Sequence, residues 1–136
     1  MVRKIMKDPM FLLQKSQPAT EKDASIGNDL LETLIAYKDV CVGMAGNMIG
    51  ELKNVIAINN CGMFMLMYNP EIVEKAGEYE TEEGCLSLQG ERTATRYEHI
   101  RVKFQDAGFN WVTIDFSGFT AQIIQHEIDH CNGILI

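Results

Sequence analysis

The sequence predicts an α+β fold in which mainly antiparallel strands enclose a helix near the C-terminal end of the chain. Five short segments rich in β-branched and aromatic residues follow one another in the middle of the chain, separated by Gly, Asn and Pro. One segment with helical spacing of apolar residues precedes them, and another follows them. A run of strands between two helices is typical of the α+β class, whereas α/β proteins alternate strands and helices.

The N-terminal part of the chain is predicted to contain a short helical turn and then a longer helix. Asp8-Pro9 is typical of an N-cap followed by the first helical position. The polar stretch 14–25 is expected to cross the surface, and Ser25 to cap a helix that ends near residues 37–38. Apolar residues recur at helical spacing in this segment: Ile26, Leu30, Leu31, Leu34 and Ile35.

The middle of the chain is predicted to be a sheet preceded by a glycine-rich segment. In that segment Gly43, Gly46 and Gly50 permit close approach of the backbone to another group. The stretch 81–98 contains too many glycines and charges to be a core strand throughout. The strand candidates are residues 54–58, 63–68, 72–79, 100–104 and 111–116.

The last predicted element is a helix from about Ser117 to Asn132, closed by Gly133 as the residue after the C-cap. A chain of 136 residues is long enough to bury one core without cross-links. The sequence contains no internal repeat, low-complexity tract or linker. A single domain covering residues 1–136 is therefore expected.

Composition and charge narrow the range of partners. Apolar residues make up 46% of the chain and charged residues 23%, the usual balance of a globular protein. The 12 Lys and Arg against 19 Asp and Glu give a net charge of −7, which opposes binding to nucleic acid and to anionic membranes. No stretch approaches the roughly 20 apolar residues of a membrane span, and the N-terminus lacks the pattern of a signal peptide. We expect a cytoplasmic protein.

In a reducing compartment the four cysteines are not expected to form disulfides. No two of them have the CxxC spacing, so at most one or two should carry chemistry. Cys41 and Cys61 lie in apolar surroundings and are expected to be small buried residues. The other two are Cys85 and Cys131.

The segment QHEIDH, residues 125–130, is the strongest functional signal. On a helix, His126 and His130 lie one turn apart on the same face and can direct both imidazoles at one point. Glu127 lies beside that point. Two histidines that bind a divalent metal, with a glutamate that handles a proton of bound water, are typical of metal-dependent hydrolases.

A catalytic metal site needs a third protein ligand, and it must come from upstream. No Asp, Glu or His follows His130, and Cys131 points about 100° away from the ligand face. Cys85 is the strongest candidate, because a metal deprotonates a bound thiol and the neighbouring glycine permits a tight turn. His99 is an alternative ligand, although it precedes a strand and is expected to be a surface or structural residue.

Three motifs resemble those of peptide deformylases in order and spacing: GMAGNMIG at residues 43–50, EGCLS at 83–87 and QHEIDH at 125–130. The resemblance covers essentially the whole chain. It implies an α+β fold with the HExDH helix enclosed by antiparallel sheets. It also implies hydrolysis of the formyl group from the N-terminal formyl-methionine of newly made proteins, releasing formate, in the bacterial cytoplasm.

The resemblance also implies the roles of individual residues. Cys85, His126 and His130 match the metal ligands, Glu127 the general acid/base, and Leu86 the residue whose backbone N–H helps to hold the oxyanion. The metal is expected to be one divalent ion, ferrous iron first and zinc, nickel or cobalt as substitutes.

A formyl-Met peptide is the expected substrate, and an apolar pocket beside the metal is needed for its methionine. Phe119 and Ile123 precede His126 on the same helix face and are expected to form one wall. The peptide backbone is expected to pair with two segments as an added strand. The predicted substrate-binding residues there are Val42, Gly43, Met44, Glu83 and Gly84, with Arg92 near the peptide channel.

The sequence departs from the family at the oxyanion site. The first motif of the family has a glutamine whose amide donates to the oxyanion, and here that position is Met48. A thioether has no proton to donate, and losing one oxyanion donor costs about 2.7–4 kcal/mol, or roughly 10²–10³ in rate. Reduced activity is therefore expected. Either the metal and Leu86 suffice for slow turnover, or a shifted loop brings the amide of Asn47 to the metal.

Two other functions remain open at this stage. A divergent deformylase-like protein would keep the metal but act on another formamide or amide, or bind a peptide without turnover. A metallopeptidase is disfavoured because the downstream ligand is missing. Glu127 favours chemistry over binding, since a purely structural metal site needs no proton shuttle and is usually closed by a fourth ligand.

Overall fold

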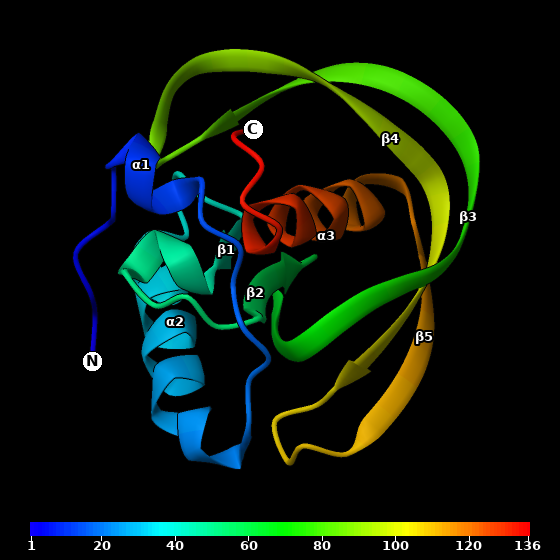
Figure 1. The fold of residues 1–136 in the computed structure, drawn as a ribbon. Coiled ribbons are helices and arrows are strands. Elements are labelled where there is room, and N and C mark those ends of the chain that lie inside the picture. Colours follow the sequence, from blue (N-terminus) through cyan, green and yellow to red (C-terminus); the bar gives the residue numbers. More distant parts are fainter.

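The computed structural model describes all residues 1–136 and has the predicted α+β architecture, with a five-stranded antiparallel sheet in the order β1-β2-β3-β4-β5 (Figure 1). The strands are β1 Gly43–Ala45, β2 Val55–Asn60, β3 Met63–Cys85, β4 Leu88–Gln105 and β5 Trp111–Ser117. The α-helices are α1 Pro9–Leu12, α2 Ala24–Ala36 and α3 Gly118–Cys131, and two 3-10 turns are η1 Glu21–Asp23 and η2 Gly46–Ile49.

A long hairpin of β3 and β4 differs most from the sequence prediction. The two candidates 63–68 and 72–79 are one strand of 23 residues, bent by register shifts after Tyr68 and Ile72. The stretch 81–98 supplies both arms at the closed end of the hairpin. Its charges and glycines are tolerated because this ribbon is largely exposed rather than a core strand. Figure 1 shows the hairpin arching over α3.

In the N-terminal segment one predicted helix cap is confirmed and another is wrong. Asp8 caps α1, because its carboxylate accepts the Met10 N–H at 3.0 Å, and Pro9 is the first helical residue. Ser25 does not cap α2, because η1 leads directly into this helix and the helix already begins at Ala24. The Asp23 carboxylate instead accepts the Thr20 N–H at 2.8 Å. Stretch 14–25 is also not wholly on the surface, since Ser16, Ala19 and Asp23 are buried.

Strand β2 divides the apolar core into two clusters. Ile56 and Ile58 belong to the cluster that packs against α3, whereas Val55 and Ala57 belong to the cluster that packs against α2. Successive side chains of a strand point to opposite faces, so a strand covered on both faces is buried at every position. The first cluster also contains Ala121, Ile123 and Ile124 of α3.

Helix α3 confirms its predicted bounds and carries polar residues into the interior. Ser117 is the N-cap, Asn132 the C-cap, and Gly133 has the left-handed φ of 74° expected after a C-cap. His126, Glu127 and His130 are all buried although none is apolar. Buried polar groups need partners or a function. No helix in the structure is both long and apolar enough to cross a membrane.

Candidate metal centre

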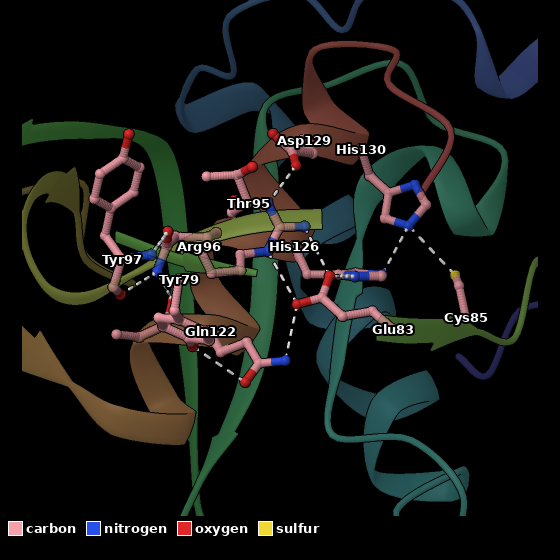
Figure 2. A network of polar contacts seen from close by, with 12 residues as sticks. Tyr79, Glu83, Cys85, Thr95, Arg96, Tyr97, Gln122, His126, Asp129 and His130 are labelled. Carbon is pink, nitrogen blue, oxygen red and sulfur yellow. Dashed lines mark hydrogen bonds and ion pairs between the residues drawn. The ribbon is translucent and has the colours of Figure 1, made fainter. Parts of the chain in front are cut away.

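Three candidate ligand atoms lie close together near the closed end of the β3–β4 hairpin. The Sγ of Cys85 lies 3.3 Å from Nε2 of His130, which lies 3.2 Å from Nε2 of His126 (Figure 2). One ligand atom from each residue lies within 4.8 Å of the other two. His99 is outside the group, on β4 and exposed. The residues predicted as ligands are therefore brought together.

Local structure explains how residues so far apart in sequence converge. The two histidines share a face of α3 because they are four residues apart. Cys85 ends β3 and pairs with Leu88 across the hairpin turn, and its Sγ reaches His130 near the C-terminal end of the helix. The i, i+4 spacing is local, whereas the position of the sulfur depends on the curvature of the whole hairpin.

The residues present fit a divalent metal. One thiolate and two imidazoles are a ligand set that zinc and iron accept. Burial lowers the pKa of His130 to about 3, so its imidazole is neutral and able to act as a ligand. Burial raises the pKa of Glu127 to about 7, and its Oε1 is buried without a hydrogen bond inside the protein. A group that accepts protons near neutral pH thus lies next to the ligands.

A buried carboxylate orients the first histidine. Oε1 of Glu83 lies 2.8 Å from Nδ1 of His126, so the ring directs Nε2 to the metal position. Burial alone would raise the pKa of Glu83, but hydrogen bonds from His126, Arg96 and Gln122 outweigh it and lower the pKa to about 2. The carboxylate is therefore ionised at neutral pH.

Arg96 holds this carboxylate in a bidentate pair. Its Nη2 lies 2.7 Å from Oε1 and its Nε 3.0 Å from Oε2 of Glu83, while its Nη1 reaches Oδ2 of Asp129 at 2.8 Å. Arg96 is 4% exposed and Glu83 7% exposed. Sequence reasoning missed this network. The one available signal was Asp129, which lies three residues after His126 and therefore near it on the helix surface.

A cavity of about 450 Å³ opens beside the ligands and Glu127. Phe119 stands at its mouth, 63% exposed, and Ile123 is buried in its wall. The other predicted residues that line it are Val42, Gly43, Glu83, Gly84 and Leu86. Val40, Cys41, Glu82 and Gln122 also line it and were not predicted to do so.

Comparison with known proteins gives the family. The sequence profile of the family described as polypeptide deformylase matches residues 2–136. This chain belongs to that family. It is 48% identical over 136 residues to a peptide deformylase of Clostridium beijerinckii, covering all of both chains. It is 39% identical to peptide deformylase 3 of Shewanella oneidensis, covering 90% of this chain and 78% of that one.

Solved structures of deformylases have the same fold. A peptide deformylase from Legionella pneumophila is similar with a TM-score of 0.88 at 36% identity, covering 99% of this chain and 83% of that one. A class I type b peptide deformylase from Acinetobacter baumannii with Met-Ala-Ser bound has a TM-score of 0.88 at 28% identity, covering 99% and 97%. Members of the family are metal-dependent hydrolases, and the cluster of Cys85 with the two histidines is a possible metal site.

Two residues predicted to bind the substrate of a deformylase lie outside the cavity. The Met44 side chain is fully buried in the cluster against α2, because β1 turns that side chain away from the ligands. Arg92 donates from Nη1 to the carbonyl of Gln89 at 3.2 Å, within the hairpin end. Neither side chain lines the cavity, although the backbone of Met44 adjoins it at Gly43.

Gly43 is required by close packing at the deformylase site. A Cβ on this residue would lie 2.6 Å from Cγ2 of Ile123 and 2.8 Å from Oε2 of Glu127. Distances below 3.0 Å are essentially never found for a Cβ. The β1 backbone therefore packs directly on the glutamate and on a cavity wall.

The structure separates Met48 from Asn47. Met48 lines the cavity at 1% exposure, and its Sδ accepts the Ala45 N–H at 3.5 Å. Asn47 points elsewhere, since its Nδ2 donates to the backbone carbonyl of His130 at 2.9 Å. In this structure the Asn47 amide therefore does not lie at the cavity, and the hypothesis that it replaces the missing oxyanion donor of the deformylase motif would require the loop to shift.

The cysteines outside the ligand group differ from expectation in one case. Cys61 is exposed, because it lies in the tight β2–β3 turn with a positive φ of 53°. Cys41 is half-buried on the cavity wall, and burial raises the pKa of its thiol to about 12. Cys131 lies outside the ligand group, as predicted, and it is buried. The prediction of a buried Cys61 was wrong.

Proposed function

We propose that this protein removes the formyl group from the N-terminal formyl-methionine of newly made peptides, releasing formate and a free amino terminus. The observation that carries the proposal is the convergence of Cys85, His126 and His130 beside the buried Glu127, in a chain of the deformylase family. The protein would act on nascent chains in the bacterial cytoplasm.

One divalent ion would be held by Cys85, His126 and His130, and ferrous iron is the first candidate, with zinc, nickel and cobalt as substitutes. When bound, the ion acts as a Lewis acid that polarises the formyl oxygen and acidifies water. His126 is held in orientation by Glu83, and the thiolate of Cys85 is the one anionic ligand.

Glu127 would act as general base and then as general acid. Its pKa near 7 allows it to accept the proton of the attacking water and to give it to the leaving amine. Its burial, and the close packing beside Gly43 that leaves no room for a Cβ there, restrict its movement. The backbone N–H of Leu86, on the cavity wall, would donate to the developing oxyanion.

The substrate would lie along the cavity as an extended strand. β1 is the edge strand of the sheet, so the Val42–Met44 backbone is free to pair with a peptide on one side. Residues Glu83 and Gly84 face it from the hairpin end. The methionine side chain would contact Ile123 and Phe119. Arg92, outside the cavity, would contact only residues farther along the peptide.

A second function is favoured by one observation, the thioether of Met48 at the cavity wall. Without an amide there, a site of this kind stabilises the oxyanion less well. The protein would then act on another formamide or amide, or bind peptides without turnover.

The test is formate release from a formyl-Met peptide by protein prepared anaerobically with ferrous iron. We expect turnover that falls by at least about 10²-fold in Glu127→Ala, the scale of a general acid/base. The variant must retain its metal, as measured on the purified protein. No turnover above this blank, with metal bound and the fold intact, would favour the second function.

A further inference from the structure

Gln122 occupies an unusual position between the cavity and the metal ligands. It lies on α3 one turn before His126 and lines the cavity. Both ends of its amide are held: the hydroxyl of Tyr79 donates to Oε1 at 3.3 Å, and Nε2 donates to Oε2 of Glu83 at 2.9 Å (Figure 2). A cavity residue is thus joined by a hydrogen bond to the partner of a metal ligand.

Glu83 accepts four hydrogen bonds, and they have different consequences. Arg96 contacts both oxygens in a bidentate pair, which fixes the place of the carboxylate. His126 donates to Oε1, and Gln122 donates to Oε2. Because Arg96 already fixes the position, the main effect of Gln122 is on how much negative charge is left for His126.

Polarisation passes along such a chain of hydrogen bonds. Donors that share one carboxylate compete for its negative charge, so each donor weakens the attraction of the carboxylate for the others, since neighbouring hydrogen bonds polarise one another. A carboxylate partner makes a histidine a stronger metal ligand. A donor at Oε2 of Glu83 therefore makes Nε2 of His126 a weaker electron donor, and leaves the metal more electrophilic.

We propose that Gln122 is a positioning residue that acts on His126 through Glu83 and sets how strongly His126 donates to the metal. The inference rests on the proposed function, because it assumes the metal centre described there. A residue with only a packing role would change stability or pocket shape, and its loss would not strengthen the metal site.

The primary variant is Gln122→Met, which keeps the length of the side chain and removes the donor. Cobalt affinity is measured by competition with a chromogenic chelator at one fixed pH, together with the thiolate-to-cobalt absorption. We expect binding that is tighter by about threefold, smaller than the 10–100-fold effect of losing a direct partner of a ligand. Gln14→Met, the same change at an exposed position, is the control and should leave both readings unchanged.

Two further variants give the sign of the effect. Gln122→Arg puts a cation next to Glu83, so we expect weaker cobalt binding than in the unmodified protein. Tyr79→Phe removes the hydroxyl that polarises the Gln122 amide. Tyr79→Phe should therefore change the cobalt affinity in the same direction as Gln122→Met but by a smaller factor. It replaces Gln122→Met as the test if that variant does not fold.

Opposite shifts for the methionine and arginine variants support the inference. Equal affinity and an unchanged spectrum in Gln122→Met, or weaker binding in both variants, would overturn it. The cobalt measurements need no substrate, so their outcome can be distinguished from the outcome of the test of the proposed function. Formate release without the cobalt shifts overturns the role of Gln122 alone, and the shifts without formate release overturn the deformylase activity alone.

Discussion

The two sides of the cavity are built differently. On the side of the hairpin and α3, the carboxylate of Glu83 is saturated with hydrogen bonds and orients His126. On the side of residues 43–50, Met48 offers a thioether with one weak contact. On the side of the hairpin and α3, His130 lacks a partner like the one that Glu83 gives to His126, since Nδ1 of His130 is buried without a hydrogen bond inside the protein.

The two sides of the cavity therefore have different functions: one holds the metal and the other stabilises the transition state. The side with the ion-pair network supports the ligands and should be intact in this chain. The side of residues 43–50 contributes the oxyanion environment, and there the sequence departs from the deformylase pattern at Met48. Each side can therefore be broken without the other, and metal content and turnover should respond separately.

The largest effect is expected from Arg96→Met, on the hairpin side. The substitution leaves the carboxylates of Glu83 and Asp129 without their shared partner. Removing one member of a buried ion pair costs about 3–5 kcal/mol of unfolding free energy. Chemical denaturation of the metal-free protein measures this loss.

Arg101→Met is the matched control for that experiment. Arg101 pairs with Asp115 and Glu74, but these side chains are largely exposed. Solvent screens an exposed pair, so its loss should change the unfolding free energy little or not at all. Equal losses in the two variants would contradict the role given to the buried network.

Met48→Gln tests the side of the cavity formed by residues 43–50. If the missing donor limits the chemistry, formate release should rise at least about tenfold, toward the 10²–10³-fold contributed by one oxyanion donor. Metal affinity should not change, because Met48 is not in the ligand group. An unchanged rate would show that the thioether does not limit this enzyme.

Gly43→Ala tests the packing of β1 on Glu127. The added methyl would overlap with Ile123 and with the glutamate oxygen. Overpacking costs about 1–3 kcal/mol of stability, and displacement of Glu127 should lower kcat with the metal retained. Gly84→Ala is the stability control, since a Cβ there meets nothing closer than 3.8 Å. A fully active Gly43→Ala protein would mean that Ile123 yields and Glu127 does not.

The sequence predicted the parts of the site that depend on short-range geometry. The i, i+4 histidines, the cap at Asp8 and the cysteine beside a glycine follow from local rules. The helix that carries the histidines was placed within a residue or two of its bounds.

The ion-pair network was beyond local rules because it depends on the register of the hairpin. Arg96 lies in a stretch judged too charged for a core strand, and only the pairing of β3 with β4 brings it to Glu83. The exposed Cys61 was missed for a related reason, since apolar neighbours in sequence do not reveal a two-residue turn. Long-range pairing decides which charges in a polar segment become buried.

The smallest effect is expected from Asn47→Ala, beside Met48. Asn47 donates to the carbonyl of His130, which also accepts the Gly133 N–H at 3.1 Å, so the substitution leaves no orphaned acceptor. The lost hydrogen bond should cost about 0.5–1.5 kcal/mol of stability. Formate release should hardly change, because Asn47 does not line the cavity. A loss of turnover on the scale of an oxyanion donor, with stability nearly intact, would instead mean that this amide moves to the metal when substrate binds.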